Sequence, residues 1–311
     1  HHHVANAISG GNPKLSPQRA AGFFETVLEQ ARPDEKVLIS AESFYRREIA
    51  REVGASASPD SASPKEQRMS AYVEAVAECV AEFDTTVLVM LRRQDLFAES
   101  LYSENSLNSG YSGSIDEFVS DIGPLLDYEA RLGVWAGAFG AENMSVRTFE
   151  TSTLVGPIEE MFVDWLGVRW TDQLVIGEPQ RVTPPRALVE FQRAINVKGQ
   201  DPRIRKCYRR WIAMLDDQVP SSELPDLGRY YLQPLDRTRL LDRCAEGNRS
   251  VARKFLGRVE LFVDDVGSVI ERYTDGRGLD YREFRDLSRQ LLQLIAEQQV
   301  GTVGNDRVRR G

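Results

Sequence analysis

The sequence predicts an α/β fold in which a parallel sheet is flanked by helices and followed by a mainly helical C-terminal half. Three short apolar or alternating runs predict strands, at Lys36–Ser40, Thr85–Leu91 and Asn143–Phe149. Helical patterns separate these runs, and strands that alternate with helices are typical of parallel sheets with crossover connections. From Thr183 onward every periodic segment has the spacing of a helix.

The helices of the first half follow from apolar residues that recur on one face. The first, Ser16–Arg32, is ended by Pro33 and Asp34. The others are expected at Ser63–Phe83, at Asp95–Leu107 with Asp95 as its N-cap, at Tyr128–Phe139 and at Pro157–Leu166. Small and polar residues predict surface loops at 54–64 and 108–114.

The second half is expected to hold four long helices. Their ranges are Pro184–Asn196, Pro202–Asp217, Asp236–Leu256 and Tyr281–Gln299. We therefore predict an α/β core over residues 1–180, a helical part packed on it over residues 181–300, and a disordered tail over residues 301–311.

Composition narrows the class of protein. Hydrophobic residues make up 41% and charged residues 28%, which is the balance of a soluble globular chain. No apolar run reaches the ~20 residues that a membrane-spanning helix needs. The net charge of -8 argues against nucleic acid as the main partner, because binding phosphates requires a basic face. The three cysteines lack CxxC spacing, which predicts reduced thiols, a cytoplasmic location and no structural zinc.

Histidine is confined to residues 1–3, which are either the remnant of a purification tag or a native stretch. A Ser/His/Asp triad, a Cys/His dyad and a histidine-rich metal site are therefore excluded from the body of the chain. Any general base must be Asp, Glu, Lys, Tyr or Cys.

The stretch VLVMLRRQDLFAESLY, residues 87–102, carries the strongest indication of a binding site. Its apolar strand runs into Arg92 and Arg93 at the point where a helix begins. Ligands of open α/β sheets bind at the carboxyl ends of the strands, and helix starts favour anions. Ser100 lies about two helical turns further on, so strand, arginine, helix and serine form a coherent phosphate clamp.

Two interpretations of these arginines stay open from the residues alone. The pair either binds an anion or is a solvated pair that ends a strand. Neighbouring residues that leave a strand diverge, so Arg93 either shares the anion with Arg92 or forms an ion pair with a carboxylate.

The segment LRRQDLFAESLY resembles the part of sulfotransferases that binds the 3'-phosphate of the sulfonyl donor PAPS (3'-phosphoadenosine 5'-phosphosulfate). Arg92, Ser100 and Tyr102 match the spacing of arginine, serine and aromatic residue in that family. The likeness is closest to bacterial sulfotransferase-like proteins of the carbohydrate type. KVLISAESFYR, VRTFE and EGNRSVARKFLGRVELF resemble further segments, so the resemblance spans roughly residues 36–262.

This resemblance implies a P-loop-type fold and transfer of a sulfonyl group from PAPS, without a metal, to a hydroxyl of a saccharide or glycolipid. Arg92, Ser100 and Arg93 would bind the donor. Glu42 resembles the glutamate base of carbohydrate sulfotransferases, although a glutamate in the first turn of a helix is also favoured by the helix dipole. The family's phosphosulfate loop, of the type Lys-Thr-Gly-Thr-Thr-Ser, does not occur in the sequence. We expect either that it precedes His1 or that the chain is a degenerate member.

Two other functions remain as alternatives. A different P-loop enzyme, such as a small-molecule kinase, would need a phosphate loop and a magnesium-binding Asp after a strand, and the sequence shows neither. A non-catalytic relative would bind a nucleotide or a protein partner. The basic run DPRIRKCYRRW, Asp201–Trp211, is either a solvated helix face or a surface that attracts an anionic acceptor or an acidic membrane.

Overall fold

The computed structural model describes residues 2–10, 16–32, 35–47, 64–154, 156–171, 174, 176, 184–197, 199–271 and 277–308. Its chain divides into two compact units, and neither unit is one continuous stretch. Unit 1 comprises His1–Leu91, Asp127–Thr148 and Glu246–Leu261, and unit 2 comprises Arg92–Leu126, Phe149–Ala245 and Phe262–Gly311. The single boundary expected near residue 180 therefore does not coincide with this division.

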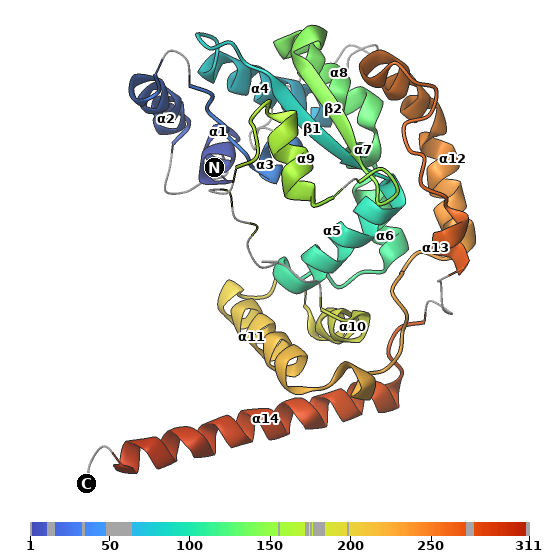
Figure 1. Cartoon of the computed structure of the whole chain (residues 1–311). Coiled ribbons are helices and arrows are strands. Elements are labelled where there is room, and N and C mark those ends of the chain that lie inside the picture. The colour runs from blue at the N-terminus through green and yellow to red at the C-terminus, as the bar shows by residue number, and fades with distance from the viewer. Residues whose placement is uncertain are drawn as a thin grey trace. The chain divides into compact units, whose positions relative to one another are not determined.

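The sheet contains two parallel strands, β1 (Val87–Arg92) and β2 (Met144–Phe149) (Figure 1). Helix α8 (Tyr128–Phe139) leads into β2 through a short 3-10 turn, Ala141–Asn143. The predicted bounds of α8 are confirmed, and those of both strands are confirmed to within two residues. The predicted α/β class is thus confirmed, with a parallel sheet of two strands among the described residues.

The strand predicted at Lys36–Ser40 is wrong. These residues form neither helix nor strand, and Val37 and Leu38 are 47% and 44% exposed. An apolar run becomes a buried strand only where neighbouring strands accept its backbone hydrogen bonds. No such neighbour lies beside this run among the described residues, where the sheet has only β1 and β2.

Unit 1 packs short helices around an apolar interior. Its helices include α1 (His2–Ile8), α2 (Pro17–Gln30), α3 (Glu42–Arg46) and α4 (Pro64–Cys79). Helix α1 packs against α2 and α3, and α4 packs against α8. The side chain of Ser16 caps α2 by accepting the N–H of Arg19. The loop predicted at 54–64 lies outside the described residues up to Pro64, where α4 begins.

Unit 2 is mainly helical. Its elements are α5 (Gln94–Asn108), α6 (Ile115–Asp121), α7 (Gly123–Leu126), α9 (Ile158–Trp165), α10 (Arg186–Ile195), α11 (Pro202–Gln218), the turn Ser221–Glu223, α13 (Gly267–Glu271) and α14 (Tyr281–Val308). Helix α12 (Pro234–Val251) begins in unit 2 and ends in unit 1, where a π-helical turn, Ala252–Leu256, continues it.

Helix α14 was expected to end at Gln299, before a disordered tail. The helix continues to Val308, and residues 309–311 lie outside the described part.

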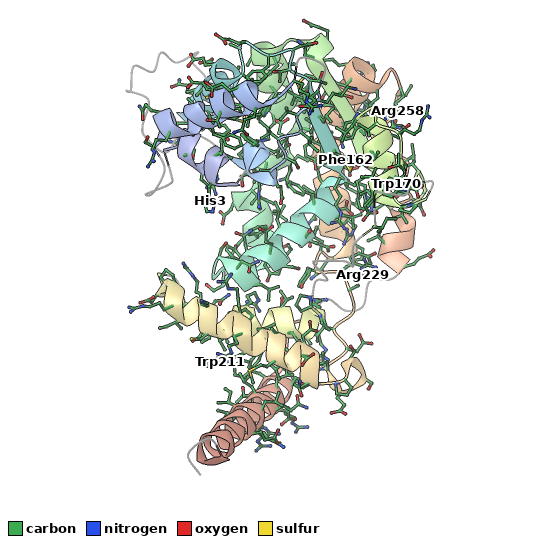
Figure 2. All side chains as sticks on the ribbon, turned by 60° about the vertical axis from the view of Figure 1, so that its left-hand side comes forward. His3, Phe162, Trp170, Trp211, Arg229 and Arg258 are labelled. Atoms are coloured by element: carbon green, nitrogen blue, oxygen red, sulfur yellow. The ribbon has the colours of Figure 1, made fainter. Side chains whose placement is uncertain are left out.

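Two apolar clusters form the core of unit 2. One gathers residues of α5, α6 and α10, including Leu101, Phe118 and Val189. The other joins α10, α11 and α14 through residues such as Leu215 and Leu287, and Trp211 of α11 packs against it (Figure 2). Helix α10 contributes to both clusters, so it links α5 to the C-terminal helices. Among the described residues, no helix combines the length and the apolar character needed to cross a membrane.

Candidate functional site

Arg92 is the last residue of β1 and is partly buried. Its guanidinium carbon lies 5.9 Å from the centroid of the Phe149 ring, and Phe149 is the last residue of β2. An arginine and an aromatic ring therefore meet at the carboxyl ends of two parallel strands. This is the edge of an α/β sheet at which ligands bind.

Arg93 lies in a different environment from its neighbour, because only 4% of it is exposed. Its Nε and Nη2 atoms donate to the two carboxylate oxygens of Asp95 at 2.8 and 3.0 Å, and Nη1 donates to the backbone oxygen of Asp264 at 2.8 Å. Each of the three guanidinium nitrogens thus donates to a protein oxygen. Of the two interpretations of Arg93, the ion pair with a carboxylate is the one found in the structure.

The prediction that Asp95 caps α5 is wrong. Arg93 occupies the N-cap position, and Asp95 lies in the first turn with no exposed surface. A cap carboxylate accepts backbone N–H groups, whereas Asp95 accepts guanidinium groups of both Arg93 and Arg237. Two cations stabilise a buried carboxylate more than one exposed cap hydrogen bond does.

Arg237 of α12 completes what we call the α5 ion cluster: Arg93, Asp95, Glu99 and Arg237. Its guanidinium is 1% exposed, donates to Asp95, and donates to Glu99 at 2.7 Å. The same oxygen of Glu99 accepts the N–H groups of Tyr231 and Leu232, both at 2.8 Å. Two arginines and two carboxylates are thus buried together, and the cluster joins the first two turns of α5 to α12 and to the segment before it.

Electrostatics within the α5 ion cluster act in opposite directions on its two carboxylates. Burial alone would raise the pKa of Asp95, but hydrogen bonds and charge from Arg93 and Arg237 outweigh it and lower that pKa. Burial raises the pKa of Glu99, against the influence of Arg237 and two backbone N–H groups. Asp95 is therefore the more firmly ionised of the two.

Ser100 lies on the exposed side of α5. Its neighbours Glu99, Leu101 and Tyr102 are buried, so the residue matched to the family's phosphate-binding serine is accessible while the rest of the motif forms the core. Tyr102 was matched to the aromatic residue of the motif. Its ring packs at 4.9 Å from that of Tyr231, and its hydroxyl lies 3.4 Å from Glu190.

Glu42 opens α3 and forms an ion pair of 3.5 Å with Arg46, one turn further on. Its side chain is 47% exposed. The expectation that Glu42 follows a sheet strand is wrong, because the residues directly before it, 35–41, form neither helix nor strand. Glu42 belongs to unit 1, whereas Arg92, Arg93 and Ser100 belong to unit 2.

Two further carboxylates lie at the end of β2 and were not singled out from the sequence. Glu150 directly follows Phe149, and its Oε1 accepts the N–H groups of Val263 and Asp264 at 2.5 and 2.7 Å. The carboxylate of Asp264 accepts the N–H groups of Thr151 and Ser152. The position of Glu150 just past a strand could have marked it, whereas nothing local marks Asp264.

Burial acts to raise the pKa of Asp264, but the hydroxyl and N–H of Ser152 and the N–H of Thr151 prevail and lower that pKa. A carboxylate that accepts several donors favours its charged form. Asp264 and Glu150 together fasten the segment around residue 264 to the end of β2.

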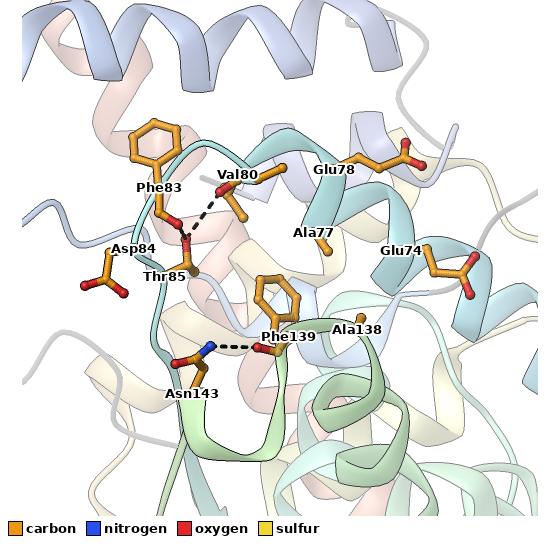
Figure 3. Close-up of a pocket in the computed structure, with 11 residues that line it drawn as sticks. Glu74, Ala77, Glu78, Val80, Phe83, Asp84, Thr85, Ala138, Phe139 and Asn143 are labelled. Atoms are coloured by element: carbon orange, nitrogen blue, oxygen red, sulfur yellow. Dashed lines mark hydrogen bonds between the residues drawn. The ribbon is translucent and has the colours of Figure 1, made fainter.

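A groove of about 580 Å³ lies in unit 1, beside the amino ends of β1 and β2 (Figure 3). Carboxylates of Glu74, Glu78 and Asp84 line it together with the rings of Phe83 and Phe139. Two polar side chains of its lining bond to the backbone: the hydroxyl of Thr85 donates to the oxygens of Val80 and Phe83, and Nδ2 of Asn143 donates to the oxygen of Phe139. An acidic groove at the amino ends of strands does not suit an anionic donor.

Among the described residues, no group of three or more His, Cys, Asp or Glu side chains is arranged to hold a metal ion. Within the described ranges, Cys79, Cys207 and Cys244 form no disulfide. Comparisons with protein-family models, with curated proteins and with solved structures gave no match.

Proposed function

We propose that the chain is a PAPS-dependent sulfotransferase of P-loop type that transfers a sulfonyl group to a hydroxyl of a saccharide or glycolipid. The observation that carries the proposal is the position of Arg92 at the carboxyl end of β1, beside Phe149 and immediately before α5. The sequence around it, LRRQDLFAESLY, supplies the resemblance.

In this proposal Arg92 binds the 3'-phosphate of the donor through its planar guanidinium, which matches two phosphate oxygens. The exposed hydroxyl of Ser100 donates to the same phosphate. Arg93 does not contact PAPS in this proposal, because its guanidinium binds Asp95 and Asp264. Arg93 instead positions the residues around it. The α5 ion cluster then fixes the first turns of α5 and with them the backbone from which Arg92 projects.

The reaction breaks the bond between sulfur and the donor's phosphate oxygen and forms a bond between sulfur and the acceptor oxygen. The acceptor proton must leave, and the body of the chain contains no histidine to take it. Glu42, which is accessible and lies within the segment KVLISAESFYR that resembles the family, is the base we propose.

Adenosine 3',5'-bisphosphate, the spent donor, tests the donor site by calorimetric titration. We expect Arg92→Ala to weaken binding about tenfold or more, because a charged bidentate contact is lost. Ser100→Ala should weaken it about fivefold. The control is Arg239→Ala, which removes a guanidinium that is 68% exposed on α12.

AMP, which lacks the 3'-phosphate, should bind Arg92→Ala and the unchanged protein alike. Failure of adenosine 3',5'-bisphosphate to bind more tightly than AMP would contradict the proposed donor site. A non-catalytic nucleotide-binding protein is the second candidate, favoured by the lack of a Lys-Thr-Gly-Thr-Thr-Ser motif in the sequence. That candidate predicts selective binding without release of sulfonated product when PAPS and saccharide acceptors are supplied.

A further inference from the structure

An open surface cavity of about 320 Å³ lies within unit 2, where α10 meets the start of α14. Its apolar lining comes from Ala194, Leu279 and Phe284, and Tyr281 also lines it. Tyr281 is 79% exposed, so a large aromatic ring stands in solvent beside the cavity. Ligand cavities range from about 300 to 1,000 Å³, so this one suits a single small ring.

A buried carboxylate contributes to the wall of this cavity. Glu190 of α10 is 4% exposed, and it accepts hydrogen bonds from Nε of Arg193 at 3.0 Å and from the hydroxyl of Tyr102 at 3.4 Å. Nη2 of Arg193 lies 2.8 Å from the same carboxylate. The charges of Glu190 and Arg193 therefore compensate each other, and both side chains line the cavity.

Arg193 and Asp280 provide hydrogen-bonding capacity toward a ligand. The side chain of Arg193 is 28% exposed, and its guanidinium also donates to the backbone oxygen of Ser112 at 3.3 Å. Asp280 uses Oδ1 to accept the N–H groups of Arg282 and Glu283 at the start of α14. Asp280 is exposed, and no described residue donates a hydrogen bond to its Oδ2, which can therefore accept one from a ligand.

The balance of charge around the cavity selects among ligands. Its lining contains two carboxylates, Glu190 and Asp280, and one cation, Arg193. An anionic ligand would meet net negative charge, and Arg193 is already neutralised by Glu190. A neutral ring that carries hydroxyl groups can donate to Asp280, accept from Arg193 and place its apolar face on Tyr281.

We propose that this cavity binds one uncharged pyranose unit of a saccharide. The inference rests on the proposed function only in taking that saccharide to be the acceptor, since binding of the sugar itself requires no donor. If the saccharide is the acceptor, the sugar unit that occupies this cavity is neutral and is not a uronic acid.

Saturation-transfer NMR on the whole protein tests this assignment directly. The probes are the methyl glycosides of glucose, galactose and mannose, together with methyl glucuronide and methyl galacturonide. At least one neutral glycoside should receive saturation, and both uronides should receive about fivefold less. Tyr281→Ala should reduce the transfer to the neutral glycoside about fivefold or more, because the aromatic platform is lost.

Leu292→Ala is the matched control, since it truncates another exposed side chain of α14, 67% exposed, that does not line the cavity. It should leave the transfer unchanged. Gly278→Val gives a second test, because a Cβ there would lie 3.5 Å from Glu190 and 3.8 Å from Arg193, and the larger side chain should reduce binding.

Equal transfer to uronides and neutral glycosides, or transfer that Tyr281→Ala leaves unchanged, would overturn the assignment. The proposed function is tested separately, by adenosine 3',5'-bisphosphate in the same samples. Nucleotide binding without glycoside binding would reject the sugar site alone, and glycoside binding without nucleotide binding would reject the donor site alone.

Discussion

Two arginine pairs in unit 2 are alike in sequence and unlike in structure. Arg92 and Arg93 end a strand, whereas Arg209 and Arg210 lie on α11 and are exposed. Arg93 is buried because Asp95 is only two residues away and is itself held by Arg237, 142 residues away. A dipeptide of two arginines is therefore uninformative by itself, and the availability of carboxylates in space decides whether a guanidinium is buried.

The difference between the buried and the exposed arginines is tested most directly at Arg237, the cation that binds both Asp95 and Glu99. Arg237→Ala leaves one buried carboxylate with a single cation and the other with none. Breaking a buried ion pair from one side costs about 3–5 kcal/mol, so we expect that loss in the free energy of unfolding. Urea denaturation measures it, with Arg239→Ala as the exposed control on the same helix. Similar losses in the two variants would show that the α5 ion cluster contributes little.

Arg93→Lys separates the effect of charge from that of geometry. The variant keeps the positive charge but loses the planar guanidinium, which can donate to both oxygens of a carboxylate. Lysine cannot donate to both oxygens of Asp95 and to the backbone oxygen of Asp264 at once. We expect a loss of about 1.5–3 kcal/mol in the free energy of unfolding. Adenosine 3',5'-bisphosphate should still bind the folded variant, in contrast to Arg92→Ala. Equal weakening of nucleotide binding by the two substitutions would assign Arg93 to the donor site after all.

Asp264, whose backbone oxygen accepts from Arg93, provides a test by pH. In the folded chain the pKa of its carboxyl group lies below the ordinary value of 3.8. As the pH falls, this carboxylate is therefore protonated in the unfolded chain before it is protonated in the folded chain. The carboxylate's contribution is complete above about pH 5 and is lost as the pH falls from about 4 through the lowered folded pKa.

Asp264→Asn should therefore lose less stability than the unchanged protein between pH 5 and pH 3. Urea denaturation at several pH values measures the difference, and Asp242→Asn, on the exposed side of α12, is the control. Parallel pH profiles for all three proteins would contradict the lowered pKa of Asp264.

The smallest effect is expected on the basic side of α11. Lys206 is exposed and makes no ion pair within the part of the chain that the structure describes. Lys206→Ala should change the free energy of unfolding by less than about 0.5 kcal/mol. A loss comparable to that of Arg93→Lys would contradict the solvated helix face, because it would mean that Lys206 makes a stabilising contact.

Periodic apolar patterns determined most of the helices and both strands of the described sheet. Tyr128–Phe139 and Met144–Phe149 follow from local spacing, because a helix satisfies its hydrogen bonds within itself and an alternating strand needs only one neighbour. Lys36–Ser40 has the composition of a strand but no neighbour to pair with. Whether a run pairs is a property of the whole fold, which the run itself does not contain.

For the candidate site, the sequence by itself determined that Arg92 lies at the end of a strand, that Ser100 lies two turns into a helix, and that histidine occurs only at residues 1–3. Only the tertiary structure decided that Arg93 belongs to a buried ion cluster and that Glu42 does not follow a strand. It also brought Glu190 and Arg193 beside Tyr281, from helices that are far apart in the chain. The physical reason is range: hydrogen bonds within helices act between near neighbours in sequence, whereas a buried charge is stabilised by whichever partner the folded chain brings within about 3 Å.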